Sequence, residues 1–282
     1  VKVAIPSEAS WVTYSMTSSG NEYKITFTVA ANTSSNRRDA TIDIYATDGT
    51  EEKIGVIQIG QLSPSTDNAK MMVFEVRASG INDYDVYLPL AGKLDCYVYW
   101  GDGQTERFRG DNYQFVHHKY NVDKSTVFEV QISGSVTCLD AREITEYYKY
   151  GIIAVKQWGM TGLTSMGDAF RGIWSLKSIP ADVLGSFANV TNFGGAFSGC
   201  SSLQEIPYGL FNYGQKIDDL YSTFSGCSSI QSIPARLFEN CISVKNTAMT
   251  FQNCRELRTL SSESLVGLVS VTKATYMFSG CN

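Results

Sequence analysis

The most regular pattern of apolar positions lies in the C-terminal half of the chain, where the same residue types recur every 27 residues. The clearest column consists of phenylalanines, namely Phe170, Phe197, Phe224, Phe251 and Phe278. Other columns keep the same phase: cysteines (Cys200, Cys227, Cys254 and Cys281) and branched aliphatic residues (Leu163, Val190, Ile217, Val244 and Val271). A repeating unit of this length cannot bury its apolar face alone, so neighbouring copies must stack and share a core. The pattern therefore predicts a solenoid.

Each copy also carries the sequence Leu-x-x-Ile-Pro or a close variant, as in Leu176–Pro180. We expect this segment to be a short strand that pairs in parallel with the next copy, about 4.8 Å away. Proline would end the strand because it has no N–H to donate. Residues 183–190 are expected to return as a helical or irregular turn. Residues 152–159 precede the first full repeat and are predicted to cap the exposed end of the stack.

The N-terminal region alternates apolar and polar residues with a period of two, as expected of strands with one buried face. The alternation is clear over 23–29 and 41–45, and stretches rich in Ser, Asn, Thr and Gly separate such segments. Several short strands with regular turns predict a β-sandwich over residues 1–62. A polar, proline-containing linker is predicted over residues 63–70.

A second alternating region follows the linker. Residues 72–77, 94–100 and 128–132 each show the strand period, and Gly101-Asp102-Gly103 is typical of a tight hairpin. This pattern predicts a second β-sandwich over residues 71–135, with the cap and the repeats occupying residues 136–282. Gly101-x-Gly103 is not a nucleotide-binding loop, because it joins two strands rather than opening a helix.

Composition and charge narrow the range of partners. The chain has 282 residues, a formal net charge of −5 and only 18% charged residues, without a cluster of Lys and Arg. Nucleic acid and anionic membranes are therefore unfavourable partners, because binding phosphate requires clustered positive charge. The sequence contains no apolar run of about 18 residues, so we expect no transmembrane segment. The first residues lack the pattern of a signal peptide. A processed secreted chain and a trimmed piece would both look like this, and a lipid anchor upstream remains compatible with the sequence.

The chain has seven cysteines, and four of them belong to the repeat. We expect these four to form a column of buried thiols, since free cysteine is among the most buried residue types. No Cys-x-x-Cys pair occurs, which argues against a zinc site. Disulfides between adjacent copies remain an alternative, although stacked side chains rarely offer the dihedral angle that a disulfide requires. No metal ion or cofactor is predicted.

Candidate catalytic groups are few. His117 and His118 are the only histidines, and neighbours in a strand point to opposite faces. A catalytic triad would have to use one of them, yet no Gly-x-Ser-x-Gly nucleophile motif occurs near a strand-to-helix turn. The acidic pairs Asp218-Asp219 and Glu51-Glu52 are adjacent in turn-like sequence, which suits a wet surface better than a glycosidase cleft. We therefore predict no catalytic residues and expect a protein that is not an enzyme.

A binding surface is predicted on the outward positions of the Leu-x-x-Ile segments. Stacking would align the side chains between Leu and Ile into two polar rows, suited to an extended partner. The residues predicted to bind are Lys177, Gln204, Glu205, Gln231 and Arg258. Tyr208 and Tyr213 could add aromatic contacts. The alternative is a face that only contacts water.

Three stretches resemble known families. Ser10–Val12, Phe27–Asn32, Arg37–Ile42 and Val56–Gly60 occur in the order typical of the BACON domain. This immunoglobulin-like module is found on secreted and surface proteins of gut Bacteroidetes. The resemblance implies either a spacer or a carbohydrate-binding domain, and Trp11 would serve the second role if its ring were exposed.

Residues 100–103, followed by His118-Lys119-Tyr120 and 128–132, resemble the PKD family, another extracellular module. The match is partial, because the family's Asp-Phe pair before Gly-Asp-Gly is missing and Thr126 stands where glycine is usual. Val155–Gly159 and the phrases Phe197–Leu203, Phe224–Ile230 and Met277–Cys281 resemble BspA-type leucine-rich repeats. That family implies an extracellular role in adhesion.

The expected fold is therefore two immunoglobulin-like all-β sandwiches followed by a leucine-rich-repeat solenoid. The expected function is that of a non-catalytic, secreted or outer-membrane surface protein. It would mediate adhesion to a host or bacterial surface protein, or to a glycan, through the repeats, with the sandwiches as spacers. The alternative is a glycan-binding component of a polysaccharide-utilisation system, which exposed aromatic platforms at Trp11 or Trp100 would favour.

Overall fold

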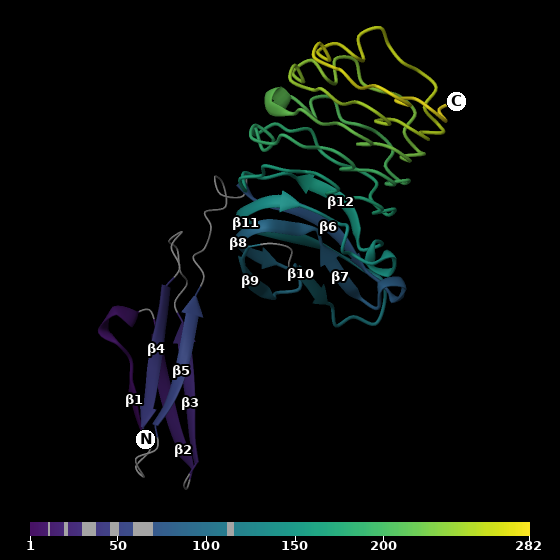
Figure 1. Cartoon of the computed structure of the whole chain (residues 1–282). Coiled ribbons are helices and arrows are strands. Elements are labelled where there is room, and N and C mark those ends of the chain that lie inside the picture. Colours follow the sequence, from purple (N-terminus) through teal and green to yellow (C-terminus); the bar gives the residue numbers. More distant parts are fainter. Residues whose placement is uncertain (11, 20–21, 30–37, 46–50, 59–69, 112–115) are drawn as a thin grey trace. The chain divides into compact units, whose positions relative to one another are not determined.

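The computed structural model describes residues 1–10, 12–19, 22–29, 38–45, 51–58, 70–111 and 116–282 (Figure 1). The chain divides into two compact units, Val1–Ala69 and Lys70–Asn282. Each unit has a hydrophobic core of its own. Of the predicted linker, residues 63–70, only Lys70 lies among the described residues.

The first unit consists of two antiparallel sheets. One contains β1 (Lys2–Ala4), β4 (Arg38–Tyr45) and β5 (Glu51–Gln58), and the other contains β2 (Val12–Ser19) and β3 (Glu22–Val29). A short 3-10 helix, η1 (Ser7–Ala9), follows β1. Val12 of β2 and Ile42 of β4 meet in the core, so the sheets bury a common interface. The strands predicted from the period-two pattern are confirmed here.

The second unit begins with a five-stranded antiparallel sheet in the order β12-β6-β11-β8-β9, together with the pair β10-β7. The strands are β6 (Met72–Ala78), β7 (Asp85–Leu88), β8 (Leu90–Tyr99), β9 (Thr105–Gly110), β10 (Val116–Lys119), β11 (Thr126–Leu139) and β12 (Ile152–Gln157). Two 3-10 helices, η3 (Gly80–Asn82) and η4 (Glu146–Tyr148), lie in the connections. The predicted hairpin joins β8 to β9, and Gly101 and Gly103 adopt φ values of 83° and 93° there.

The sheet continues directly into the repeats. β12 pairs with β6 on one side, while on the other side Ala154 forms a parallel bridge with Ser178. The end of β11 also pairs with the first repeat, because Cys138 forms a parallel bridge with Ser165. The boundary expected between residues 135 and 136 thus falls inside β11, and the residues expected to be a cap form the edge strand of the sheet. One continuous core runs from the sheet into the repeats.

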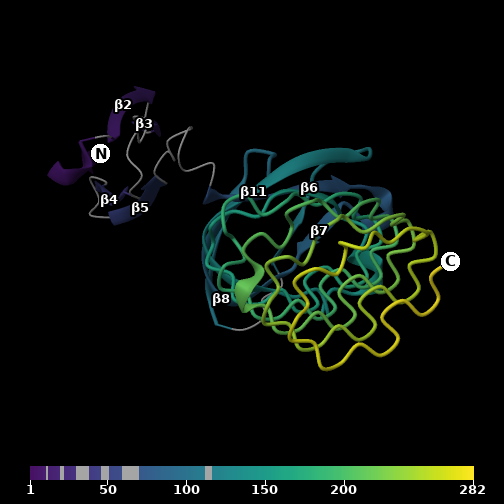
Figure 2. The same cartoon turned by 90° about the horizontal axis from the view of Figure 1, so that it is seen from above.

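We number the repeats by the phase of the sequence: repeat 1 is 163–189, repeat 2 is 190–216, repeat 3 is 217–243 and repeat 4 is 244–270. Figure 1 shows them stacked beyond β12, with residues 271–282 continuing the stack, and Figure 2 views the stack from above. The predicted phenylalanine row is confirmed: neighbouring rings lie 5.4 to 5.7 Å apart, and their planes are within 10°. The first four rings are fully buried, and Phe278 is partly buried.

The prediction of strands in the Leu-x-x-Ile-Pro segments was wrong, because these segments form only isolated bridges such as Ser232–Thr259. The proline that follows each Ile has no N–H, so little backbone remains to extend the pairing. A longer series of parallel bridges lies elsewhere, at the third position of each repeat. It connects Cys138, Ser165, Asn192, Asp219, Asn246 and Lys273.

The return segments are turns, with a single 3-10 helix, η5 (Gly214–Lys216), in repeat 2. Within the described ranges no residue is assigned to an α-helix. A second stacked pair, Phe211 and Phe238, lies in these segments with ring centres 5.7 Å apart. Aromatic rings thus fill the core on the return side as well.

A candidate binding groove across the repeats

The structure places the predicted binding row on the surface. Lys177, Gln204, Glu205, Gln231 and Arg258 are all exposed. Neighbouring copies are joined through the backbone, because Gln204 N–H donates to Lys177 O and Arg258 N–H to Gln231 O, each at 3.3 Å. The Arg258 guanidinium donates to Glu256 at 2.9 Å.

The aromatic residues named from the sequence are divided between surface and core. Tyr208 is 67% exposed and Tyr213 is 39% exposed. Trp100 is fully buried, and its indole N–H donates to Glu106 at 2.9 Å, so it offers no aromatic platform. Trp11 lies outside the described residues.

The two histidines of β10 face opposite sides of the strand, as predicted. His117 is exposed, and its Nδ1 lies 2.9 Å from Asp85 Oδ1. His118 is buried; its Nε2 lies 2.8 Å from Asp102 Oδ2, and its ring stacks on Trp100. His118 therefore fastens the β8–β9 hairpin at the edge of the core.

The third position of each repeat forms a turn that shapes one face of the stack. At this position a side-chain oxygen accepts the N–H of the residue two places ahead, at 3.1, 2.7, 2.8 and 3.1 Å in repeats 1 to 4. The acceptors are Ser165, Asn192, Asp219 and Asn246, residue types known for such local bonds. The sixth position then adopts a left-handed conformation in every repeat, with Asp168, Gly195, Ser222 and Met249 there. The chain therefore bends sharply along one line of the stack.

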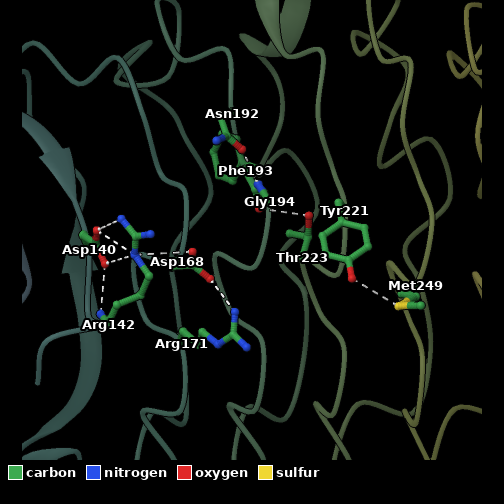
Figure 3. Close-up of polar contacts among 10 residues, drawn as sticks. All are labelled: Asp140, Arg142, Asp168, Arg171, Asn192, Phe193, Gly194, Tyr221, Thr223 and Met249. Carbon is green, nitrogen blue, oxygen red and sulfur yellow. Dashed lines mark hydrogen bonds and ion pairs between the residues drawn. The ribbon is translucent and has the colours of Figure 1, made fainter. Parts of the chain in front are cut away.

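Paired charges lie beside this line, between β11 and repeat 1 (Figure 3). The Arg142 guanidinium is 2.7 Å from Asp140 Oδ2 and 3.7 Å from Asp168 Oδ2. Arg171 reaches Asp168 Oδ1 at 3.0 Å. The hydrogen bond to Asp140, followed by the charge of that carboxylate, raises the pKa of Arg142. The carboxylates are mostly covered, at 17% and 21% exposure, whereas both arginines extend into solvent.

Beyond Asp168 the surface is hollowed into a notch of about 280 Å³. The notch is lined by residues of repeats 1 to 3, among them Asp168, Arg171, Asn192, Gly194 and Tyr221. A second hollow of about 410 Å³, towards β11, shares Asp168 and Asn192 with it. We call these two hollows together the polar groove.

Glycine keeps the notch open. A Cβ added at Gly194 would lie 3.0 Å from Asn192 Oδ1 and 3.6 Å from Asp219 Oδ2, so a side chain would fill the space. The Thr223 hydroxyl donates to Phe193 O at 3.0 Å and so joins repeats 2 and 3 next to these residues. On the next repeat the ring of Tyr221, 43% exposed, extends towards Met249, where its hydroxyl lies 3.5 Å from Sδ (Figure 3).

The cysteine column is structural. Cys200, Cys227 and Cys254 are buried as predicted, and Cys281 is partly exposed. Each thiol donates to the carbonyl oxygen of a phenylalanine one repeat earlier, at 3.1 Å. Burial raises the pKa of Cys254 to about 12, which keeps it protonated. In the part of the chain that the structure describes, no three His, Cys, Asp or Glu side chains gather where they could hold a metal ion.

The polar groove was not predicted from the sequence, because its lining changes from repeat to repeat. The fifth position is Gly167, Gly194, Tyr221 and Ala248 in repeats 1 to 4. A usable signal was the column of turn-forming Ser, Asn and Asp at the third position, followed by glycines, which indicates a sharp bend.

The comparisons with known proteins concern the first unit. Residues 2–62 match the BACON domain. The family is described as "Putative binding domain, N-terminal". Strands β1 to β5 all lie within the BACON domain, which supports a non-catalytic binding role for the chain.

No curated protein and no solved structure matches the chain. Among the described residues, none belongs to a helix that is long and apolar enough to span a membrane.

Proposed function

We propose that this protein is a non-catalytic, extracellular surface protein that adheres to a partner through the polar groove. The BACON domain would act as a spacer, and the sheet of β6 to β12, which shares its core with the repeats, would hold them and contribute part of the groove. The partner would be a molecule on the surface of host or bacterial cells. The binding description of the BACON family and the order of modules along the chain support this proposal.

We also propose that the repeats are a leucine-rich-repeat solenoid of the BspA type, and that residues 71–135 are a divergent relative of the PKD module. The stacked phenylalanine row and the parallel bridges at 27-residue spacing support the first assignment. The Gly101-Asp102-Gly103 hairpin supports the second.

The observation that carries the proposed function is that the polar groove continues from β11 across repeats 1 to 3. Recognition sites combine a hollow with a few fixed polar groups. Here Asp140 and Asp168 are held by Arg142 and Arg171, and Asn192 is held by its own turn. In the predicted row, Gln231 and Arg258 also line a hollow, of about 340 Å³. The other members of the row are exposed side chains, which need immobilising when a partner binds.

Binding of the fluorescently labelled full chain to cultured epithelial cells and to bacterial cells tests the proposal. The groove variant combines Arg171→Ala with Tyr221→Ala, both partly exposed positions. The matched control combines Lys177→Ala with Arg258→Ala in the predicted row. We expect saturable binding that the groove variant weakens at least tenfold and the control leaves unchanged.

A truncated chain provides a further control. Residues 70–282 have their own core and are the appropriate fragment, since a chain beginning at 136 would cut through β11. The proposal expects this fragment to bind like the full chain. If the groove variant bound normally while the fragment or the row control lost binding, the polar groove would not be the binding site. The proposal would be overturned if the full chain bound neither the epithelial nor the bacterial cells.

A further inference from the structure

The hydrogen-bonding groups of the notch define the chemistry of its ligand. Carboxylates such as Asp168 only accept hydrogen bonds, and the Arg171 guanidinium only donates them, while the Asn192 amide does both. These three side chains line one hollow. A ligand that satisfies them must therefore donate and accept at closely spaced atoms, and hydroxyl groups do this best because each one does both.

The charges of the groove disfavour an ionic ligand. Asp140 and Asp168 are already paired with Arg142 and Arg171, at 2.7 and 3.0 Å. One oxygen of Asp219 accepts the N–H of Tyr221 at 2.8 Å. An incoming cation or anion would have to compete with these pairs. A neutral ligand can instead bond to their outward edges and leave them intact.

An extended peptide fits less well. Along the third-position bridges, backbone N–H groups are already committed to neighbouring repeats, as where Phe193 N–H donates to Asp219 O at 2.9 Å and Leu220 N–H to Asn246 O at 2.9 Å. The groove therefore offers no free strand edge for a peptide backbone to extend. Recognition must come from side chains.

The size of the notch and the position of Tyr221 restrict the ligand further. At about 280 Å³ the notch lies just below the usual range for ligand pockets, roughly 300–1,000 Å³, and it has room for a single small ring. Beside it, the Tyr221 ring offers an exposed apolar surface on the following repeat. Pyranose rings combine hydroxyl edges with an apolar C–H face, so they match both features.

We propose that the polar groove binds a neutral oligosaccharide, with one sugar ring in the notch at Gly194 and a neighbouring ring against Tyr221. The inference rests on the proposed function, because it names the class of molecule that the same groove recognises. Asp168, Arg171 and Asn192 bond to hydroxyl groups, and the Tyr221 ring carries the stacking contact.

The test is titration calorimetry of the full chain with short neutral oligosaccharides of the cello, xylo, manno and malto series. We expect at least one series to bind, and Tyr221→Ala to weaken that binding at least tenfold. Tyr221→Phe retains the ring and should bind within about threefold of the wild type. Gly194→Ser places atoms in the notch and should also weaken binding. Tyr208→Ala, another exposed tyrosine, is the matched control and should have no effect.

Unfolding midpoints in urea identify any variant that is misfolded, and Tyr221→Phe against Tyr221→Ala then decides the role of the ring. The inference is overturned if none of the four series binds, or if Tyr221→Ala and Gly194→Ser bind like the wild type. Cell binding that depends on the groove but survives periodate treatment and is lost after protease treatment would indicate a protein partner. That result would overturn the inference and leave the proposed function standing, whereas cell binding unaffected by groove variants would overturn both.

Discussion

Replacing Phe224 with alanine tests how strongly the repeats depend on their shared interior. Phe224 is fully buried in repeat 3, and its ring stacks on Phe197 at 5.4 Å and on Phe251 at 5.6 Å. Truncating a buried phenylalanine to alanine typically costs about 3–5 kcal/mol. Each lost aromatic pair is worth about 0.5–1.5 kcal/mol beyond the buried area. The first range already includes lost contacts, and Phe224 loses two pairs, so we expect Phe224→Ala to fall at its upper end and lower the free energy of unfolding by about 4–5 kcal/mol.

Phe278 provides the matched comparison, because it occupies the same column. It is only partly buried and has one stacked partner in the row, Phe251 at 5.6 Å. With less area to expose and one pair to lose, Phe278→Ala should cost about 1–2 kcal/mol. The contrast between the two variants is sharper than either value alone.

Urea unfolding followed by tryptophan fluorescence measures both variants. Trp158 is buried against Phe170 and Phe187, so its emission reports on the repeats. The two units have separate cores, so two transitions are expected, and only the one reported by Trp158 should shift. Equal destabilisation by the two variants, or a loss below about 1 kcal/mol for Phe224→Ala, would refute the reasoning.

Three further predictions follow from particular contacts. In the native chain a thiol reagent at pH 8 should label Cys138 and Cys281, the two partly exposed thiols, and in urea it should label all seven cysteines. Rapid labelling of Cys227 in the native chain would contradict the buried column. Asp219→Ala removes a turn acceptor and should cost about 1 kcal/mol, whereas Asp219→Asn should cost much less, since asparagine fills this role in the adjacent repeats. Burial opposes ionisation of Asp102, but the hydrogen bonds from His118 and from the Gln104 N–H outweigh burial and lower the pKa of Asp102. The ionised Asp102 therefore stabilises the fold fully above about pH 4, and this stabilisation is lost as the pH falls through the lowered pKa. Asp102→Asn should therefore be less stable than the wild type at pH 7, with the difference shrinking below about pH 4; a difference that grows in acid would contradict this.

The buried rows could be predicted from the sequence because each copy needs the same residue type at the same depth. Phe170 and Phe224 fill equivalent spaces, and so do Cys200 and Cys227. Alternation of period two located the strands for the same reason, since one face of each strand is buried. Constant surroundings impose a constant residue, and a single sequence is then enough to reveal the pattern.

The groove could not be predicted in this way, because its surroundings are not constant. Gly194 and Tyr221 occupy equivalent positions on adjacent repeats, and the difference between them makes a hollow beside a ring. The junction between the sheet and the repeats could not be predicted either. In sequence β12 is an apolar segment like those of the repeats, and only its pairing with β6 shows that it belongs to the sheet. Long-range pairing leaves little trace in the local pattern.

Hydrogen exchange of the full chain, followed by mass spectrometry, tests the central claim most directly. In the stack, Phe197 N–H donates to Thr223 O, Gly199 N–H to Ser225 O and Phe224 N–H to Thr250 O, at 2.7 to 2.8 Å. The account predicts slow exchange at these equivalent positions in repeats 1 to 4, comparable with strands β6 and β11. Slow exchange confined to residues 70–157, with rapid exchange throughout 163–270, would contradict it.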